Sequence, residues 1–203
     1  MNGFMIQTDP LPISQLYNWL IVYLRFMFPE LLKSTICFTR FESPLGTFIS
    51  CATPKGICLL EFSDRKMLQT ELKLIRKKFN TEIEEGESEY FDLVKLQLDE
   101  YFNKKRKEFT VPLHMIGTPF QQKAWNELLK IPYGQTRSYK AQALALNSPL
   151  AVRAVANANG MNMIAIVIPC HRVIGEDGSL TGYGGGLWRK KWLLELESNQ
   201  LRF

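Results

Sequence analysis

The sequence predicts two successive domains of different class. An α/β domain is expected over residues 34–112 and a mostly α-helical domain over residues 113–203, after an N-terminal extension at residues 1–33. Short β-rich runs broken by Pro and Gly dominate residues 35–62, whereas short, well-capped helical segments follow residue 112. With 203 residues, 46% of them hydrophobic, the chain is long enough to bury a core in each domain.

The extension contains a strongly apolar run at residues 13–28, interrupted by Gln15, Asn18 and Arg25. This run is too short and too broken to predict a membrane span. The chain start also lacks the basic residues and small-residue cleavage site of a signal peptide. We therefore expect a packed amphipathic helix or a loosely attached extension, with membrane attachment as the alternative.

In the first domain, the alternation and spacing of apolar residues predict strands followed by helices. The strands are expected at residues 35–41, 47–52 and 57–62, and the helices at residues 66–79 and 89–102. The acidic segment 81–89 is expected to be a solvated loop. The basic segment 103–108 is expected to be one as well, with phosphate contact as its alternative. No catalytic group of residues stands out in this domain.

The second domain is expected to begin with a capped helix. Thr118 is followed by Pro119 and, three residues after the cap, by Gln121, which are the parts of a capping box. Ser138 opens a short helix, and a second cap-plus-proline start at Ser148 opens a helix that ends near Gly160. Two short helices around a tight turn form a helix-turn-helix outline, which occurs in DNA-binding domains and in other helical domains alike.

Charge and cysteine content narrow the class of protein. Residues 1–112 carry 15 Lys and Arg against 15 Asp and Glu, whereas residues 113–203 carry 10 against 5. A basic domain beside a neutral one indicates a polyanionic partner, usually nucleic acid. Four cysteines without a C-x-x-C pair favour a reduced, cytoplasmic protein over a secreted, disulfide-bonded one.

The segment from residue 164 to residue 175, IAIVIPCHRVIG, is the most informative in the chain. A continuous apolar run ends at Pro169, and Cys170 and His171 follow directly. We expect a buried strand that delivers a thiol beside an imidazole, as in an activated thiolate. On an extended chain the two side chains would face opposite ways, so they could not easily form a direct hydrogen bond. For an isolated Cys-His pair, the alternative is a core cysteine beside a turn-capping histidine.

IPCHRV resembles the active-site signature of the O6-methylguanine-DNA methyltransferase (O6-alkylguanine-DNA alkyltransferase) family. The likeness extends from TPFQQKAW through PYGQTRSY and PLAVRAVANANG to GSLTGYGGGLWRKKWLLELE, over residues 118–197. It implies a ribonuclease-H-like N-terminal domain and a winged-helix-like C-terminal domain. It also implies irreversible alkyl transfer from O6-alkylguanine in double-stranded DNA to the protein's own cysteine, by a monomer without a cofactor. Repair of O4-alkylthymine stays open.

The resemblance also implies roles for catalytic residues. Cys170 matches the alkyl acceptor, His171 the base that takes the thiol proton through a water, and Glu197 the carboxylate that orients the histidine. Asn162 matches the asparagine that braces the turn around the cysteine. Tyr139 matches the tyrosine that helps to rotate the phosphate of the target nucleotide and donates a proton toward the departing guanine.

Further residues match the DNA-binding and base-binding positions of the family. Arg153 matches the arginine that fills the gap left by the flipped nucleotide, with Ala151 among its small neighbours on the DNA side. Tyr183 matches the aromatic wall of the guanine pocket, to which Val173 also belongs. Many relatives have a serine after this tyrosine, but Gly184 stands here and keeps the backbone N–H that faces the guanine O6.

Some relatives bind zinc in the N-terminal domain through Cys and His. Cys37, Cys51, Cys58 and His114 do not fall at the matching positions, so we expect no structural metal. Three other functions remain as alternatives: a cysteine hydrolase or transferase that turns over, a relative that only binds alkylated bases, and a helix-turn-helix regulator. The binding-only relatives lack the cysteine, and the Ala- and Val-rich segment 149–158 offers a regulator few base-reading side chains.

Overall fold

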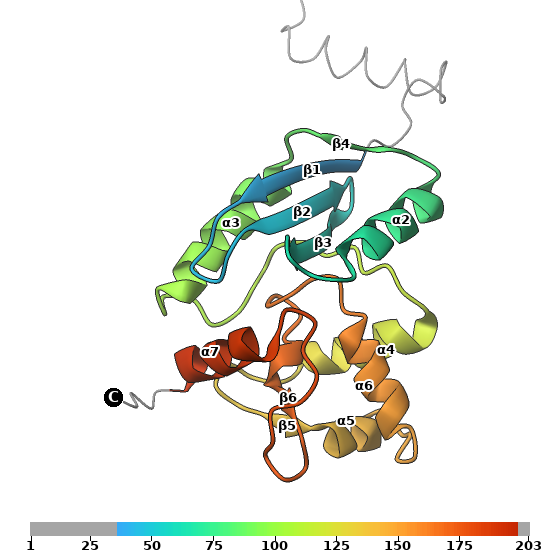
Figure 1. The fold of residues 1–203 in the computed structure, drawn as a ribbon, viewed down its shortest axis with the longest axis vertical. Helices are drawn as coiled ribbons and strands as arrows, with labels where there is room; N and C mark the ends of the chain where they lie inside the picture. Colours follow the sequence, from blue (N-terminus) through green and yellow to red (C-terminus); the bar gives the residue numbers. More distant parts are fainter. Residues whose placement is uncertain (1–35, 199–203) are drawn as a thin grey trace, which may run out of the picture. The chain divides into compact units, whose positions relative to one another are not determined.

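The computed structural model describes residues 36–198 (Figure 1). The prediction of an extension with an amphipathic helix at residues 13–28 lies outside the described residues. Residues 36–198 pack as one compact unit. The predicted boundary at residues 112 and 113 stays a prediction. No helix within the described part of the chain is long and apolar enough to span a membrane.

A four-stranded sheet in the order β3-β2-β1-β4 forms the centre of the N-terminal half. The three expected strands are present as β1 (Ile36–Phe41), β2 (Phe48–Thr53) and β3 (Gly56–Phe62), paired antiparallel. β4 (Ile83–Glu85) pairs parallel with β1, inside the acidic segment that we expected to be a loop. The loop prediction was wrong here because charged side chains at an edge strand remain solvated while the backbone completes the ladder.

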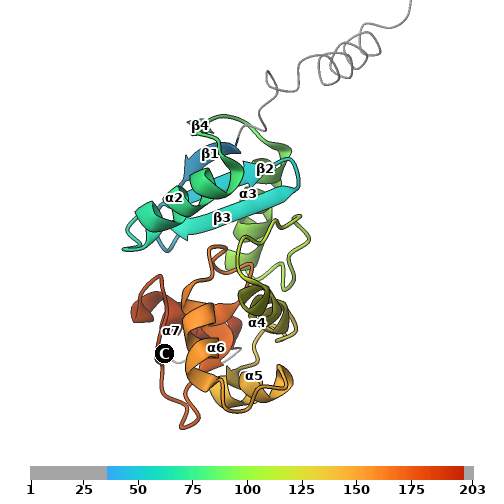
Figure 2. The same ribbon diagram turned by 90° about the vertical axis from the view of Figure 1, so that its right-hand side faces the viewer.

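Two helices cover the sheet, α2 (Leu68–Phe79) and α3 (Glu89–Phe102), close to the predicted bounds (Figures 1 and 2). Each helix packs into a separate hydrophobic core. Side chains of α2 pack with Cys58 and Leu59 of β3, whereas those of α3 pack with Ile57 and Leu60 of the same strand. The register between β2 and β3 shifts between Cys51 and Ala52, which interrupts the usual alternation, so Cys58 and Leu59 lie on the same face. The sheet is apolar on both sides.

The core beneath α3 continues into the C-terminal half. Leu60 donates its backbone N–H to Met163 O at 2.8 Å and accepts from Ala165 N at 2.8 Å. At the other end of β3, a Cβ on Gly56 would lie 2.2 Å from Pro112 O, and the φ of Gly56 is +134°. Only glycine therefore fits this approach. The free edge of β3 thus anchors the segment that carries the functional residues.

The C-terminal half is mostly helical, as predicted. It contains α4 (Pro119–Leu129), α5 (Tyr139–Ala145), α6 (Val152–Gly160) and α7 (Leu187–Glu197). Both hydrogen bonds of the capping box between Thr118 and Gln121 are present, and Ser138 caps α5 through Ala141 N. A two-stranded parallel sheet joins β5 (Arg137–Ser138) to β6 (Val173–Ile174).

Helix α6 begins three residues later than the cap-plus-proline pattern predicts. Ser148 donates its hydroxyl to Leu146 O at 3.3 Å, and the N-cap position belongs to Ala151, which makes no side-chain cap bond. The hydroxyl is engaged in the preceding turn and leaves the helix start uncapped. A helix over residues 149–158, as predicted, would place Arg153 near its middle, but Arg153 lies in the first turn of α6.

The buried strand expected before Cys170 is not formed. Residues 164–168 are a compact turn in which only Ile164 makes a sheet bridge, and Ile166 has a φ of 68°. The turn closes through Ile168 N, which donates to Ile164 O at 3.1 Å. An apolar run indicates burial but does not by itself distinguish a strand from other buried conformations. Cys170–Arg172 form a 3-10 turn, η1, so the extended-chain argument for His171 does not apply.

Candidate active site

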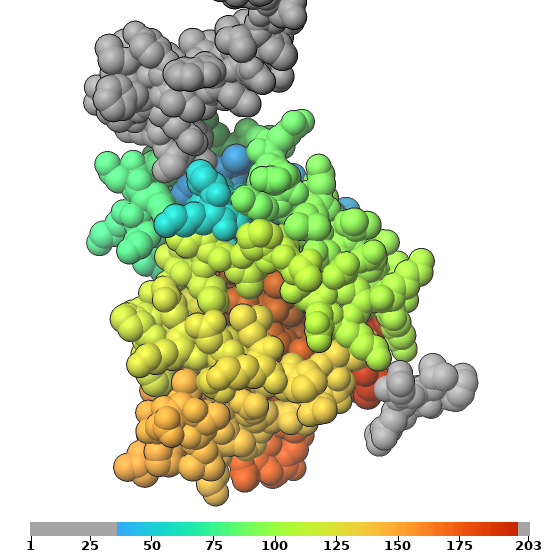
Figure 3. All heavy atoms as spheres, turned by 180° about the vertical axis from the view of Figure 1, so that it is seen from behind, coloured from blue at the N-terminus to red at the C-terminus, as the bar shows by residue number. Residues whose placement is uncertain are grey.

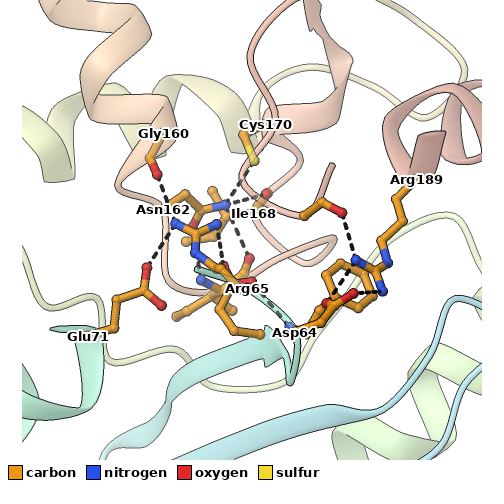
Figure 4. A network of polar contacts seen from close by, with 12 residues as sticks. Asp64, Arg65, Glu71, Gly160, Asn162, Ile168, Cys170 and Arg189 are labelled. Carbon is orange, nitrogen blue, oxygen red and sulfur yellow. Dashed lines mark hydrogen bonds and ion pairs between the residues drawn. The ribbon is translucent and has the colours of Figure 1, made fainter. Parts of the chain in front are cut away.

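Cys170 begins η1, directly after Pro169, and is 9% exposed. The amide of Asn162 donates to Cys170 Sγ at 3.3 Å and to Ile168 O at 2.9 Å (Figure 4). The carbonyl oxygen of the same side chain accepts from Ile164 N at 3.0 Å. Asn162 therefore holds both ends of the turn before the thiol and places an N–H donor on the sulfur.

The surroundings of the thiol act in opposite directions on its protonation. Burial raises the pKa of Cys170, whereas the Asn162 hydrogen bond and the charges of Arg65 and Lys190 lower it. The pKa remains above its usual value. The resting group is therefore a thiol, and a nucleophilic thiolate requires a nearby base.

His171 is fully buried, and its Nε2 lies 2.9 Å from Oε1 of Glu197. Burial alone would raise the pKa of Glu197, but hydrogen bonds and charges from His171 and Arg172 lower it to about 2. Burial also lowers the pKa of His171. At neutral pH the carboxylate is ionised and accepts the Nε2–H of a neutral imidazole. Nδ1 is then the free base, and it has no hydrogen-bond partner among residues 36–198.

Glu197 is the centre of a buried polar cluster. Arg172 donates Nε to Oε2 at 2.9 Å and Nη2 to Oε1 at 2.9 Å, and Gly134 N donates to Oε2 at 3.0 Å. The hydroxyl of Tyr101 donates to Oε1 at 2.7 Å. These donors satisfy both carboxylate oxygens, which lets a buried charge persist.

Tyr101 comes from α3 in the N-terminal half, where the sequence showed no catalytic group. The residue is fully buried, yet its position in the apolar stripe of α3 predicted only a core side chain. One general rule pointed to a polar role for Tyr101: a buried tyrosine needs a hydrogen-bond partner for its hydroxyl. The sequence does not identify Glu197 as that partner.

We expect Tyr101→Phe to destabilise the protein by about 1.5–3 kcal/mol, because it removes a buried hydrogen bond to a charged acceptor without changing the packing. Thermal or urea unfolding measures the loss. Tyr133→Phe is the matched control, since the hydroxyl of Tyr133 donates to the neutral Leu196 O at 3.2 Å and the residue is only partly buried. Equal stability changes in the two variants would contradict the importance of the Glu197 contact.

The loop of residues 181–186 is tied to the site by two side chains. Tyr139 donates its hydroxyl to Thr181 O at 3.0 Å. Lys190 donates to Thr181 O at 2.6 Å and to Val173 O at 2.5 Å, and burial lowers the pKa of Lys190 to about 8. Val173 is fully buried, and it contacts Lys190 through its backbone carbonyl. Tyr139 and Val173 are thus brought to one loop.

The same loop places Tyr183 beside the histidine. The Tyr183 and His171 rings meet edge-on with centroids 6.5 Å apart, and the Tyr183 hydroxyl is buried without a hydrogen-bond partner in the described region. Burial and the nearby Cys170 raise the pKa of Tyr183. Gly184 follows at the surface. The predicted pocket residues Tyr183 and Gly184 therefore lie close to the Cys170–His171 turn.

Arg153 and Ala151 lie apart from the thiol, at the start of α6. Arg153 is exposed and Ala151 half-buried, and the adjacent Leu150 is 99% exposed. No described hydrogen bond or ion pair involves Arg153 in residues 36–198. The exposed apolar side chain of Leu150 beside the cation of Arg153 is consistent with a surface that contacts another molecule.

A surface pocket lies on the side opposite the view of Figure 1. The space-filling view in Figure 3 shows a hollow between the green and yellow segments, with orange-red atoms of the last third of the chain inside. Its lining includes Lys107, Tyr133, Pro169 and Arg172. Cys170 does not line it, so this pocket reaches the back of η1 and not the thiol.

The cysteines of the N-terminal half lie in different surroundings. Cys51 and Cys58 are fully buried in the sheet, Cys37 is partly exposed, and His114 Nδ1 lies 2.8 Å from Thr53 Oγ1. Within residues 36–198, no group of three or more His, Cys, Asp or Glu residues is placed to hold a metal ion.

Both halves of the chain match family models. Residues 36–115 match the ribonuclease-like domain of 6-O-methylguanine DNA methyltransferase, and residues 119–199 match the DNA binding domain of the same family. A methylated-DNA–protein-cysteine methyltransferase of Methanosarcina barkeri is 43% identical over 79% of this chain and 96% of its own length. The inducible enzyme of that name from Bacillus subtilis is 43% identical over 74% of this chain and 83% of its own length.

Solved structures agree with these matches. The O6-methylguanine methyltransferase of Mycobacterium tuberculosis is 40% identical, with a TM-score of 0.68 over 80% of this chain and 93% of that one. A structure of Mycobacterium tuberculosis OGT in complex with DNA is also 40% identical, with a TM-score of 0.69 over 79% of this chain and 92% of that one. From its sequence and its fold alike, the chain belongs to the 6-O-methylguanine DNA methyltransferase family.

Proposed function

We propose that this protein repairs DNA directly, by moving an alkyl group from the O6 of guanine to Sγ of its own Cys170, once and irreversibly. One observation carries the proposal. A buried thiol that accepts a hydrogen bond from Asn162 is followed in the chain by His171, whose Nε2 is paired with the buried carboxylate of Glu197. In a chain of this family, such a group supports alkyl transfer to cysteine.

In the proposed mechanism, Nδ1 of His171 accepts the thiol proton through a water, and Glu197 stabilises the imidazolium through Nε2–H. The thiolate attacks the alkyl carbon, a C–S bond forms, and the C–O6 bond breaks. Its electron pair goes to the guanine, which a proton from the hydroxyl of Tyr139 neutralises. The product is a thioether, which has no acyl carbon for water to attack, so the cysteine is not regenerated. No step needs a cofactor.

The proposed substrate is double-stranded DNA that contains O6-alkylguanine. The excess of positive charge after residue 112 would attract the phosphate backbone. Arg153 would enter the base stack when the target nucleotide is flipped into the pocket of Tyr183, with Ala151 beside the backbone. We propose a monomer, as the resemblance to the family implies. The free state of all four cysteines supports a cytoplasmic location.

We expect Arg153→Ala to slow transfer about tenfold in duplex DNA and less than about twofold in single strands, because only the duplex must be unstacked to flip the base. Single-turnover transfer on the two substrates measures the difference. Lys123→Ala is the control, since it removes an exposed charge from another helix, α4. Equal slowing on both substrates would contradict the wedge role.

The test of the proposed function is incubation with an oligonucleotide that carries O6-methylguanine, followed by mass analysis of the Cys170 peptide. We expect one methyl group per protein, on Cys170, with no further transfer when DNA is in excess. Repeated turnover would instead indicate a cysteine hydrolase or transferase, and binding without transfer a recognition protein. Affinities for undamaged sequences that differ by about a thousandfold would indicate a regulator.

A further inference from the structure

Arg65 follows β3 in the N-terminal half, but its guanidinium reaches the C-terminal half (Figure 4). The side chain is 5% exposed and forms ion pairs with Glu61 at 3.0 Å and Glu71 at 2.8 Å. Its Nη2 also donates to Gly160 O at 2.8 Å, at the end of α6. This carbonyl lies two residues before Asn162, the residue that contacts the sulfur of Cys170. The guanidinium is therefore held on several sides and cannot shift without losing these contacts.

The guanidinium also fills the space beside the pocket loop. A Cβ built on Gly184 would lie 1.7 Å from Nη1 and 2.6 Å from Cζ of Arg65. The backbone of Gly184 is not in the left-handed region, so its conformation does not require glycine. The close approach of Arg65 is thus the steric reason for glycine at this position.

We propose that Arg65 is a positioning residue of the active site: its guanidinium takes the place of a side chain at residue 184 and fixes the loop of Tyr183 relative to Cys170. The significance of this loop rests on the function proposed above. Residue 65 would then set one boundary of the base pocket from the other half of the protein, a position where no sequence motif pointed to function.

The charge of Arg65 supports the same placement. It lowers the pKa of Cys170, and Cys170 in turn raises that of Arg65. Burial raises the pKa of Glu61 to about 8 and raises that of Glu71 as well. At neutral pH Glu61 is therefore largely protonated, and Arg65 does not face two full negative charges. The guanidinium lies where its charge favours a thiolate at Cys170.

A double-mutant cycle tests the steric part. Gly184→Ala and Arg65→Ala are each expected to slow transfer about tenfold. The double variant should be no slower than the slower single variant, because the alanine methyl then has room. Gly160→Ala is the matched control, since a Cβ there meets nothing within 4 Å. Additive losses in the double variant would overturn the proposal.

If Arg65→Ala does not fold, Glu61→Gln/Arg65→Ala/Glu71→Gln replaces it, because that variant leaves no unpaired buried charge.

A second readout needs no DNA, so it stands even if the proposed function fails. The rate at which iodoacetamide alkylates Cys170, followed by peptide mass analysis across pH, reports the ionisation of the thiol. Arg65→Met should move the midpoint to higher pH, and Arg65→Lys should restore part of the shift. A midpoint that does not move in Arg65→Met would mean that Arg65 is only a structural clamp, and would overturn its placement at the thiol.

Discussion

Replacement of Cys170 by alanine is expected to abolish alkyl transfer and to leave DNA affinity within about twofold of the original, because the phosphate contacts of the C-terminal half do not involve the thiol. The fold should persist, since Asn162 keeps its bonds to Ile168 O and Ile164 N when the sulfur is gone. Transfer from labelled O6-methylguanine DNA and a titration of the same duplex measure the two quantities.

The control for this experiment is Cys37→Ala. The thiol of Cys37 is partly exposed, and its one hydrogen bond among residues 36–198 is donated to Glu87 O, so its removal should leave transfer unchanged. In the Cys170→Ala protein, label on Cys37, Cys51 or Cys58 would contradict Cys170 as the acceptor.

Replacement of Glu197 by glutamine is expected to have the second largest effect. The amide has the shape of the carboxylate but no charge, so Arg172 would be left as a buried cation without its partner. Loss of one member of a buried ion pair costs about 3–5 kcal/mol of folding free energy. The tautomer of His171 would also no longer be fixed, and transfer should fall about a hundredfold, as expected when a general base is impaired. Urea unfolding and single-turnover rates measure the two losses.

Glu197→Gln should also change how the free energy of unfolding depends on pH in acid. The pKa of Glu197 is about 2 in the folded protein, against the ordinary value of 4.5 for a glutamate. The stability that this difference contributes is present above pH 4.5 and is lost as the pH falls through about 2. Glu197→Gln should lack this part of the acid profile, whereas Glu195→Gln, an exposed neighbour on α7, should keep it. Identical acid profiles of the original protein and Glu197→Gln would contradict the depressed pKa.

Much of the fold could be predicted because its signals are local. The period of two in the strands, the capping box at Thr118 and the N-cap at Ser138 act through residues a few positions apart. The predictions that were wrong concern segments whose conformation depends on distant partners. Segment 81–89 gains β4 only because β1 offers a free edge, and residues 164–168 form a turn held by β3.

By itself, the sequence determined the fold class, the order of the elements and the neighbouring positions of Cys170 and His171. It also placed Glu197 on the last helix. Only the tertiary structure decided which groups meet these residues. Two such groups come from the half without a recognisable motif. Tyr101 contacts Glu197, which lies 96 positions further along the chain. Arg65 contacts the pocket loop at Gly184, more than a hundred positions away. Such contacts follow from the packing of the sheet against the helices, because burial makes each polar group find its partner wherever the fold brings one within reach.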